Sequence, residues 1–199
     1  MTTQGKSGGK ESRISSLAQH HDRYSEDGLF LRYVRGQVRV FWPRIAFISL
    51  ISLALAGLAS PIVGVMSILI AGTAELIDSM FMRYAYRKLQ AGVPSRGLRR
   101  ISAVTGLLHG FGMFLGAASP YWVGALFSQN QAVEIDPLFA ICVLAGAALN
   151  AGLLMPYNLP AAIARLSVYT IAPFVLLFSS DSVLSQMELH LRLGGLAIL

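Results

Sequence analysis

The stretch "AELIDSMFMRY", residues 74–84, closes a long apolar run and places two carboxylates, Glu75 and Asp78, three residues apart. Residues at i and i+3 lie on the same face of a helix, so both side chains can point into a helix bundle. Within a membrane, such carboxylates bind a proton, a cation or a ligand, or they pair with basic neighbours near the end of a span. Which role applies depends on the elements that carry them.

The composition predicts an integral membrane protein. The 199 residues are 54% hydrophobic and only 13% charged, with a mean hydropathy of +0.58, which leaves too little polar surface for a soluble globule. The formal net charge of +6 is concentrated in short segments beside apolar runs, a pattern typical of membrane orientation, so we expect no nucleic-acid partner. The single cysteine, Cys142, excludes a disulfide within the chain and a cysteine-based metal site.

The apolar runs predict an all-α, polytopic transmembrane helix bundle with five complete spans, a truncated sixth and an N-terminal amphipathic interfacial helix, since a span needs about 20 apolar residues. Residues 1–27 predict a disordered cytoplasmic leader, and residues 28–42 an amphipathic juxtamembrane helix. The bundle covers residues 43–199, with spans at about 43–59, 62–82, 101–119, 137–155, 160–179 and, incomplete, 189–199. Because the last run reaches only about half of the hydrocarbon core, we expect a fragment of a longer protein.

Within residues 28–42, three arginines share one narrow arc of a helical wheel, and aromatic and aliphatic side chains share the other side. We expect these arginines to contact anionic lipids at the inner membrane surface, with the apolar side in the interface. A simple cytoplasmic extension of the first span remains an alternative. The three residues are Arg32, Arg35 and Arg39.

Basic and acidic connections alternate along the chain. Residues 1–44 and 83–100 are rich in arginine and lysine, whereas the connection after the third span carries only Glu134 and Asp136 as charged residues. Basic segments stay on the cytoplasmic side, so the N-terminus is predicted to be cytoplasmic.

This orientation places Glu75 and Asp78 in the inner third of the bilayer, with His109 and Asn150 from the next two spans at a similar depth. Ionisable groups at that depth usually face the bundle interior, so we predict an intramembrane polar network of these four residues. A packing or relay role, a ligand- or proton-sensing site, and a metal or catalytic site all remain open. Packing is favoured, because polar side chains also hold membrane helices together.

Small residues near these positions predict close helix packing. Gly112 and Gly116 share a face with His109, and Gly146 lies one turn before Asn150. Two further glycines in the sixth run predict a place where a neighbouring helix packs and slides. These are Gly194 and Gly195.

Catalytic motifs are missing from the sequence. It contains neither H-E-x-x-H nor G-x-S-x-G, and residues 75–83 lack the further aspartates that would hold two metal ions. One histidine within the spans is too few for a bis-histidine haem. We therefore expect no catalytic residue, no metal ligand and no cofactor in this chain.

Two stretches carry a family resemblance: "GLLHGFGMFLGAASPYWVGAL", residues 106–126, and "LNAGLLMPYNLPAAIARLSVY", residues 149–169. With the basic leader and the tightly connected helices, they resemble the membrane-embedded N-terminal input region of bacterial sensor histidine kinases, particularly hybrid kinases of alphaproteobacterial type. The resemblance, from about residue 28 onward, implies an inner-membrane location, two-component signalling, and a homodimer formed through the last helix and a following linker. ATP and Mg²⁺ are then expected only in a kinase part outside this chain, so enzyme activity is expected only of the full-length protein.

We therefore expect a sensory module that passes a signal through its last helix to a cytoplasmic effector, by a small shift of packed helices. The alternatives are a small transporter or channel subunit with an intramembrane polar network, and a structural assembly protein. The predicted external connections are too short for a folded ligand-binding domain, so the sequence does not indicate the stimulus.

Overall fold

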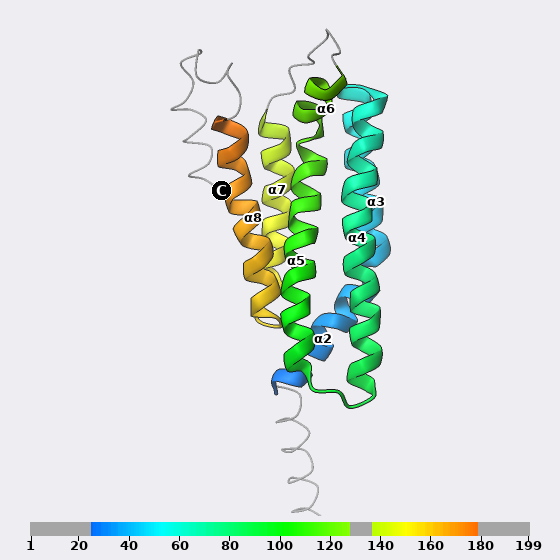
Figure 1. Cartoon of the computed structure of the whole chain (residues 1–199), viewed down its shortest axis with the longest axis vertical. Helices are drawn as coiled ribbons and strands as arrows, with labels where there is room; N and C mark the ends of the chain where they lie inside the picture. Colours follow the sequence, from blue (N-terminus) through cyan, green and yellow to red (C-terminus); the bar gives the residue numbers. More distant parts are fainter. Residues whose placement is uncertain (1–24, 128–136, 179–199) are drawn as a thin grey trace, which may run out of the picture.

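The computed structural model describes residues 25–127 and 137–178, and the elements in these ranges are all α-helices, which confirms the all-α part of the prediction. Most of the helices run along the long axis of an elongated bundle, with α2 at one end and α6 at the other (Figure 1). In chain order they are α2 (Glu26–Arg39), α3 (Phe41–Leu58), α4 (Pro61–Gln90), α5 (Ser95–Ala117), α6 (Ser119–Phe127), α7 (Pro137–Leu153) and α8 (Leu159–Phe178).

In the part of the chain that the structure describes, three helices, α3, α4 and α8, are long and apolar enough to cross a membrane, and α7 is a shorter apolar helix. The outward-facing side chains agree with this, because large apolar residues point away from the bundle. Leu53, Met80 and Leu149 are 70%, 71% and 73% exposed. Such a surface is unfavourable in water and suits lipid, so the chain has the character of a multi-pass membrane protein.

The helix ends follow local sequence signals. Ser60 accepts a hydrogen bond from the backbone N–H of Val63, and Pro61 occupies the first turn, so α4 begins there. After α4, Gly92 adopts a left-handed conformation with φ of 79°, which lets the chain turn back into α5. These two turns lie at opposite ends of the bundle (Figure 1).

The second and third predicted spans have different bounds from the helices that the structure contains. The second, predicted at 62–82, continues to Gln90, because the helix extends beyond its apolar run into a basic segment. The third, predicted at 101–119, begins at Ser95 and stops at Ala117, and the short helix α6 follows as a separate element. The sixth run, residues 189–199, and nearly all of the leader lie outside the described residues.

Helix α2 is separated from α3 by a break at Val40, whose φ of −91° and ψ of 14° end the helix at Arg39, not at residue 42. Phe30, Tyr33 and Val34 are buried and pack against Met82 and residues of α5. The apolar side of α2 therefore faces the bundle and not the lipid interface that the sequence suggested, because α4 and α5 offer it a protein surface.

The start of α2 is also tied to the start of α5. The carboxylate of Asp27 accepts a hydrogen bond of 3.2 Å from the backbone N–H of Ser95. Arg99 donates to the carboxylate of Glu26 at 2.9 Å and to its backbone oxygen at 2.8 Å. Polar contacts at the start of α2 and apolar contacts along its buried face therefore fix this helix against the bundle.

Glycines let α4 and α5 approach closely. A Cβ atom at Gly112 would overlap that of Ala74, and one at Gly116 would lie 3.0 Å from that of Ala71. Both positions therefore contribute to packing, as small residues do at membrane helix contacts. Gly146 differs from the prediction: it is exposed, with open space beside it, because this side of α7 faces away from the described helices.

Candidate functional site

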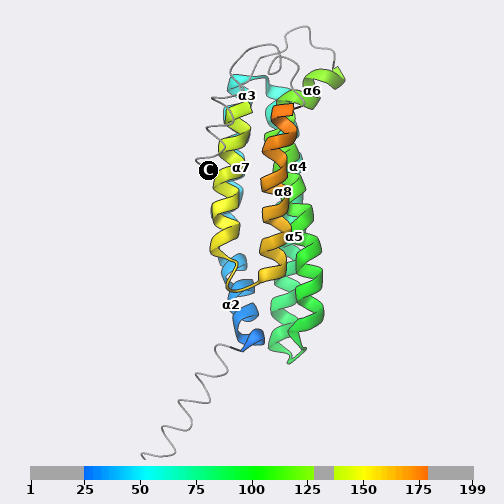
Figure 2. The ribbon, with the colours of Figure 1, turned by 90° about the vertical axis from the view of Figure 1, so that its left-hand side faces the viewer.

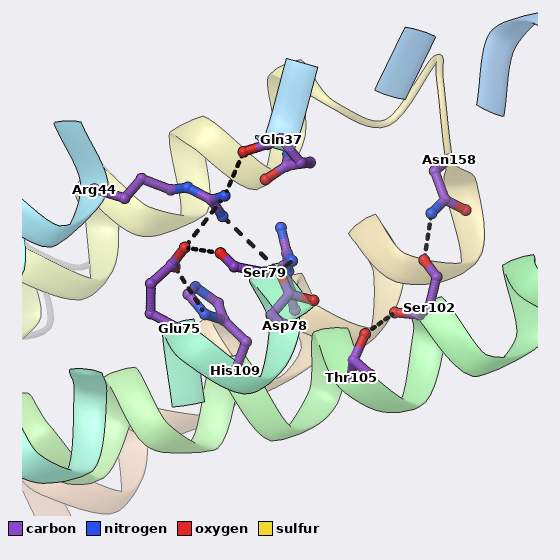
Figure 3. Close-up of polar contacts among 10 residues, drawn as sticks. Gln37, Arg44, Glu75, Asp78, Ser79, Ser102, Thr105, His109 and Asn158 are labelled. Carbon is purple, nitrogen blue, oxygen red and sulfur yellow. Dashed lines mark hydrogen bonds and ion pairs between the residues drawn. The ribbon is translucent and has the colours of Figure 1, made fainter. Parts of the chain in front are cut away.

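Two buried carboxylates lie on the side of α4 that faces the bundle. Glu75 and Asp78 both have an exposed fraction of 0%. Figure 3 shows Glu75 between Arg44 of α3 and His109 of α5, with Asp78 beside them. A charged group without access to water needs partners of opposite charge or hydrogen bonds, and the neighbouring helices provide them.

Arg44 contacts three groups at once. Its Nη2 atom lies 3.2 Å from Oε1 of Glu75, and its Nη1 atom lies 3.8 Å from Oδ2 of Asp78. The same Nη2 donates a 2.8 Å hydrogen bond to the backbone oxygen of Gln37 in α2. One guanidinium therefore connects α2, α3 and α4 (Figure 3).

Arg165 provides the second positive charge. It lies on α8, is 3% exposed, and donates from Nη2 to Oδ2 of Asp78. Asp78 is therefore shared by two guanidiniums from two different helices. The two arginines balance the two carboxylates, so the cluster is neutral when its imidazole is neutral.

Glu75 presents different neighbours on its two oxygens. Ser79 donates a 2.9 Å hydrogen bond to Oε1, the oxygen that also faces Arg44. Oε2 lies 3.5 Å from Nδ1 of His109. Among the described residues, neither of these two facing atoms has a hydrogen-bond partner.

We call Arg44, Glu75, Asp78, His109 and Arg165 the charge cluster. No family model, curated protein or solved structure matches this chain. The role of the charge cluster therefore follows from its own geometry, in which charges from α3, α4 and α8 and an imidazole from α5 hold these four helices together.

A second polar contact lies beside the charge cluster. Asn158, which directly precedes α8, donates from its side-chain amide to Oγ of Ser102 in α5, and both residues are buried. Thr105 donates to the backbone oxygen of Ser102 (Figure 3). On α2, burial raises the pKa of the Tyr33 phenol, so this side chain stays protonated and adds no charge.

The structure brings together three of the four residues of the predicted network. Glu75, Asp78 and His109 are neighbours, but Asn150 lies exposed on α7 and does not join them. Its depth along the helix is similar, but its side of α7 faces outward. The buried amide in this region belongs instead to Asn158.

Sequence reasoning missed the two arginines of the charge cluster. Arg165 stands inside the apolar run of 160–179, where a charged side chain needs a partner, and this was the available signal. Arg44 follows Pro43 at the start of the first span and was counted only as part of the basic leader.

The arginines predicted to face the membrane surface, Arg32, Arg35 and Arg39, are exposed on α2. Gly194 and Gly195 lie outside the described residues.

The charge cluster is not built like a metal centre. Within residues 25–127 and 137–178, no group of three or more histidine, cysteine, aspartate or glutamate side chains could hold a metal ion. Each carboxylate already faces a guanidinium. The chemistry open to this arrangement is the exchange of ion-pair partners and the binding of a proton.

Proposed function

We propose that this chain is the membrane-integral signal-input module of a bacterial signal-transduction protein, with a sensor histidine kinase as the full-length type. The observation that carries the proposal is Arg44, whose one guanidinium bonds to the end of α2 and to a carboxylate of α4. A change in the charge cluster must therefore alter how α2 is held. The resemblance of residues 106–126 and 149–169 supports the same function.

The proposed mechanism is an exchange of ion-pair partners. Buried ion pairs have few stable arrangements, because a charge without a partner inside a membrane bundle is very unfavourable. A stimulus that favours a second set of pairs would shift the helices that carry them by about 1 to 2 Å. Such a two-state element can pass a signal to a cytoplasmic effector.

The alternative of a small transporter or channel subunit has less support. A pathway for solutes or hydrated ions needs an opening beside its carboxylates, whereas the transfer of a single proton does not. Glu75 and Asp78 are fully buried, and a guanidinium faces each of them. These features fit ion pairs that hold helices together better than they fit an ion-conducting pathway.

The proposed topology has five complete spans, formed by α3, α4, α5, α7 and α8, with the N-terminus in the cytoplasm of a bacterial inner membrane. Basic residues support this orientation, because they are exposed at the end of the bundle that carries α2. Besides the arginines of α2, they are Arg83, Arg87, Lys88, Arg96 and Arg100. We propose anionic lipids as their partners, and homodimerisation through the last span that the sequence predicts.

Cysteine labelling from the periplasmic side tests the topology. Cys142 is exposed and is first replaced by serine, so that only the introduced thiol reacts. We expect Glu134→Cys to be labelled and Arg96→Cys to be protected. Labelling at position 96 with protection at position 134 would reverse the orientation.

The signalling role is tested in the full-length protein. The reading frame after Leu199 should encode a cytoplasmic effector, and a kinase there would bind ATP and Mg²⁺. We expect Asp78→Asn to lock effector output in one state while membrane insertion stays normal. Arg100→Gln, which removes a guanidinium exposed on α5, is the control and should leave the output responsive. Unchanged output in the Asp78 variant, with solute flux across liposomes by the purified protein, would favour the transporter.

A further inference from the structure

We propose that Glu75 and His109 form a binding site for one proton, and that Arg44 transmits its occupancy to the end of α2. The ligand is a proton that enters from water at acidic pH. The proton site is argued from contacts between side chains within the bundle. Only the final step, in which the movement of α2 reaches an effector, rests on the proposed function.

The first argument is the pair of facing atoms. Nδ1 of His109 and Oε2 of Glu75 are 3.5 Å apart, both are buried, and neither has a hydrogen-bond partner among the described residues. Two acceptors that face each other away from water are unfavourable, so the imidazole proton belongs on Nδ1, where it points toward Oε2. When this proton is on Nε2 instead, Nδ1 can accept from a protonated Oε2, so the pair can take up one additional proton while the imidazole stays neutral.

The second argument is the charge of the surroundings. The two guanidiniums and the two carboxylates sum to zero before the additional proton binds, and the cluster then carries one positive charge. Both carboxylates have one buried oxygen without a hydrogen-bond partner, Oε2 of Glu75 and Oδ1 of Asp78. Asp78 contacts both guanidiniums and keeps its charge, whereas Glu75 contacts one guanidinium, and its free oxygen lies beside the imidazole. The additional proton therefore goes to Glu75 and His109.

Polar groups from five helices surround this pair. They are Gln37 of α2, Arg44 of α3, Asp78 and Ser79 of α4, Thr105 of α5, and Arg165 and Tyr169 of α8.

The third argument concerns what Arg44 does when Glu75 loses its charge. Arg44 then keeps the backbone oxygen of Gln37 and the more distant carboxylate of Asp78, 3.8 Å away. Attraction toward Asp78 pulls the guanidinium away from its present position. Because Gln37 belongs to the last turns of α2, the break between α2 and α3 at Val40 is where the protein responds.

Hydrogen exchange of the whole chain in lipid nanodiscs tests this inference at pH 8 and pH 5, with each rate divided by the intrinsic rate at that pH. We expect the amides of residues 36–44 to lose protection about tenfold at pH 5, because a charge-assisted contact is lost. Glu75→Gln is neutral at both pH values and should show the low protection throughout. His109→Gln should remove the pH dependence.

Glu26→Gln is the matched control, since it neutralises another glutamate that contacts an arginine and lies at the exposed start of α2. It should keep the pH dependence of residues 36–44. Equal protection of the wild-type protein at both pH values, or a pH effect that survives in Glu75→Gln, would overturn the proton site.

A second measurement avoids any loss of folding in the variants. Wild-type protein labelled with ¹³C in its glutamate side chains should gain the infrared band of one buried, protonated carboxyl group at pH 5, and lack of this band would refute the site. The effector output of Asp78→Asn tests the signalling proposal separately. A proton site with an effector that ignores pH would show that the proton is not the signal.

Discussion

At the α2 end of the bundle, α3, α4 and α8 meet through charged side chains, whereas toward α6 the helices meet through small and apolar ones. The charged contacts centre on Asp78, which both guanidiniums approach. In the other half, Ser52 and Ser67 form a 3.3 Å hydrogen bond beside a cavity of about 10 Å³. That cavity is lined by Ile48, Ile51, Ser67, Ala71, Met113, Gly116, Ala117 and Val143.

The difference separates two structural tasks. Ion pairs are directional and costly to leave unmade, so the charged half determines which helices are neighbours. Small residues set how closely the helices approach, and a small apolar void tolerates slight changes in their positions. A bundle built in this way can change pairs at one end while the other end stays packed. Figure 2 shows that α4, α5 and α8 run side by side along the bundle between these two ends.

The largest effect is expected from removal of one charge. Arg165→Leu should destabilise the bundle by about 3–5 kcal/mol, because it leaves Asp78 buried with only the more distant Arg44. Reversible unfolding in mixed micelles measures this loss. The double variant with Asp78→Leu should recover most of the stability, and the surface control Arg100→Gln should cost about 0–1 kcal/mol. A single variant as stable as this control would contradict the importance of the buried pair.

A smaller loss is expected in the packed half. Gly112→Ala should cost about 1–3 kcal/mol, because its Cβ would overlap that of Ala74 and force α4 and α5 apart. Gly146→Ala, with open space around it, should be neutral or stabilise the helix by up to about 1 kcal/mol. The same unfolding assay compares the two variants. Equal stability would show that the contact of α4 with α5 is looser than its geometry indicates.

The smallest effect is the coupling between Glu75 and His109. A double-mutant cycle with Glu75→Gln and His109→Ala should give a coupling energy of about 0.6–2 kcal/mol, typical of polar contacts between membrane helices. The three variants and the wild-type protein are unfolded at the same pH. Additive losses of stability would make the two residues independent, and the charged half would then depend on its arginines alone.

Much of the fold could be predicted, because apolar runs and helix ends are local signals. Ser60 and Pro61 mark a helix start in the sequence and in the structure. The length of α4 was underestimated because a helix does not stop where its apolar run stops. Its last turns, up to Gln90, also carry the surface on which α2 packs.

The candidate site was only partly predictable, since rise per residue gives depth but not the direction of a side chain around the helix axis. Glu75 and His109 share both depth and direction, whereas Asn150 shares only depth. Arg165 was visible as a charge near the start of a span. Its pairing with Asp78 depends on how α8, which packs against α5, is placed relative to α4, and no local pattern contains that information.

The separation of Arg165 from Asp78 by 87 residues bears on how the protein is made. Ribosomes add about 5–20 residues per second, so roughly 4 to 17 seconds pass between the synthesis of the acid and that of its partner. During this interval, Arg44 is the partner already available to α4. We expect α3 and α4 to leave the insertion machinery as a pair, with Asp78 held by Arg44 until α8 arrives and completes the bundle.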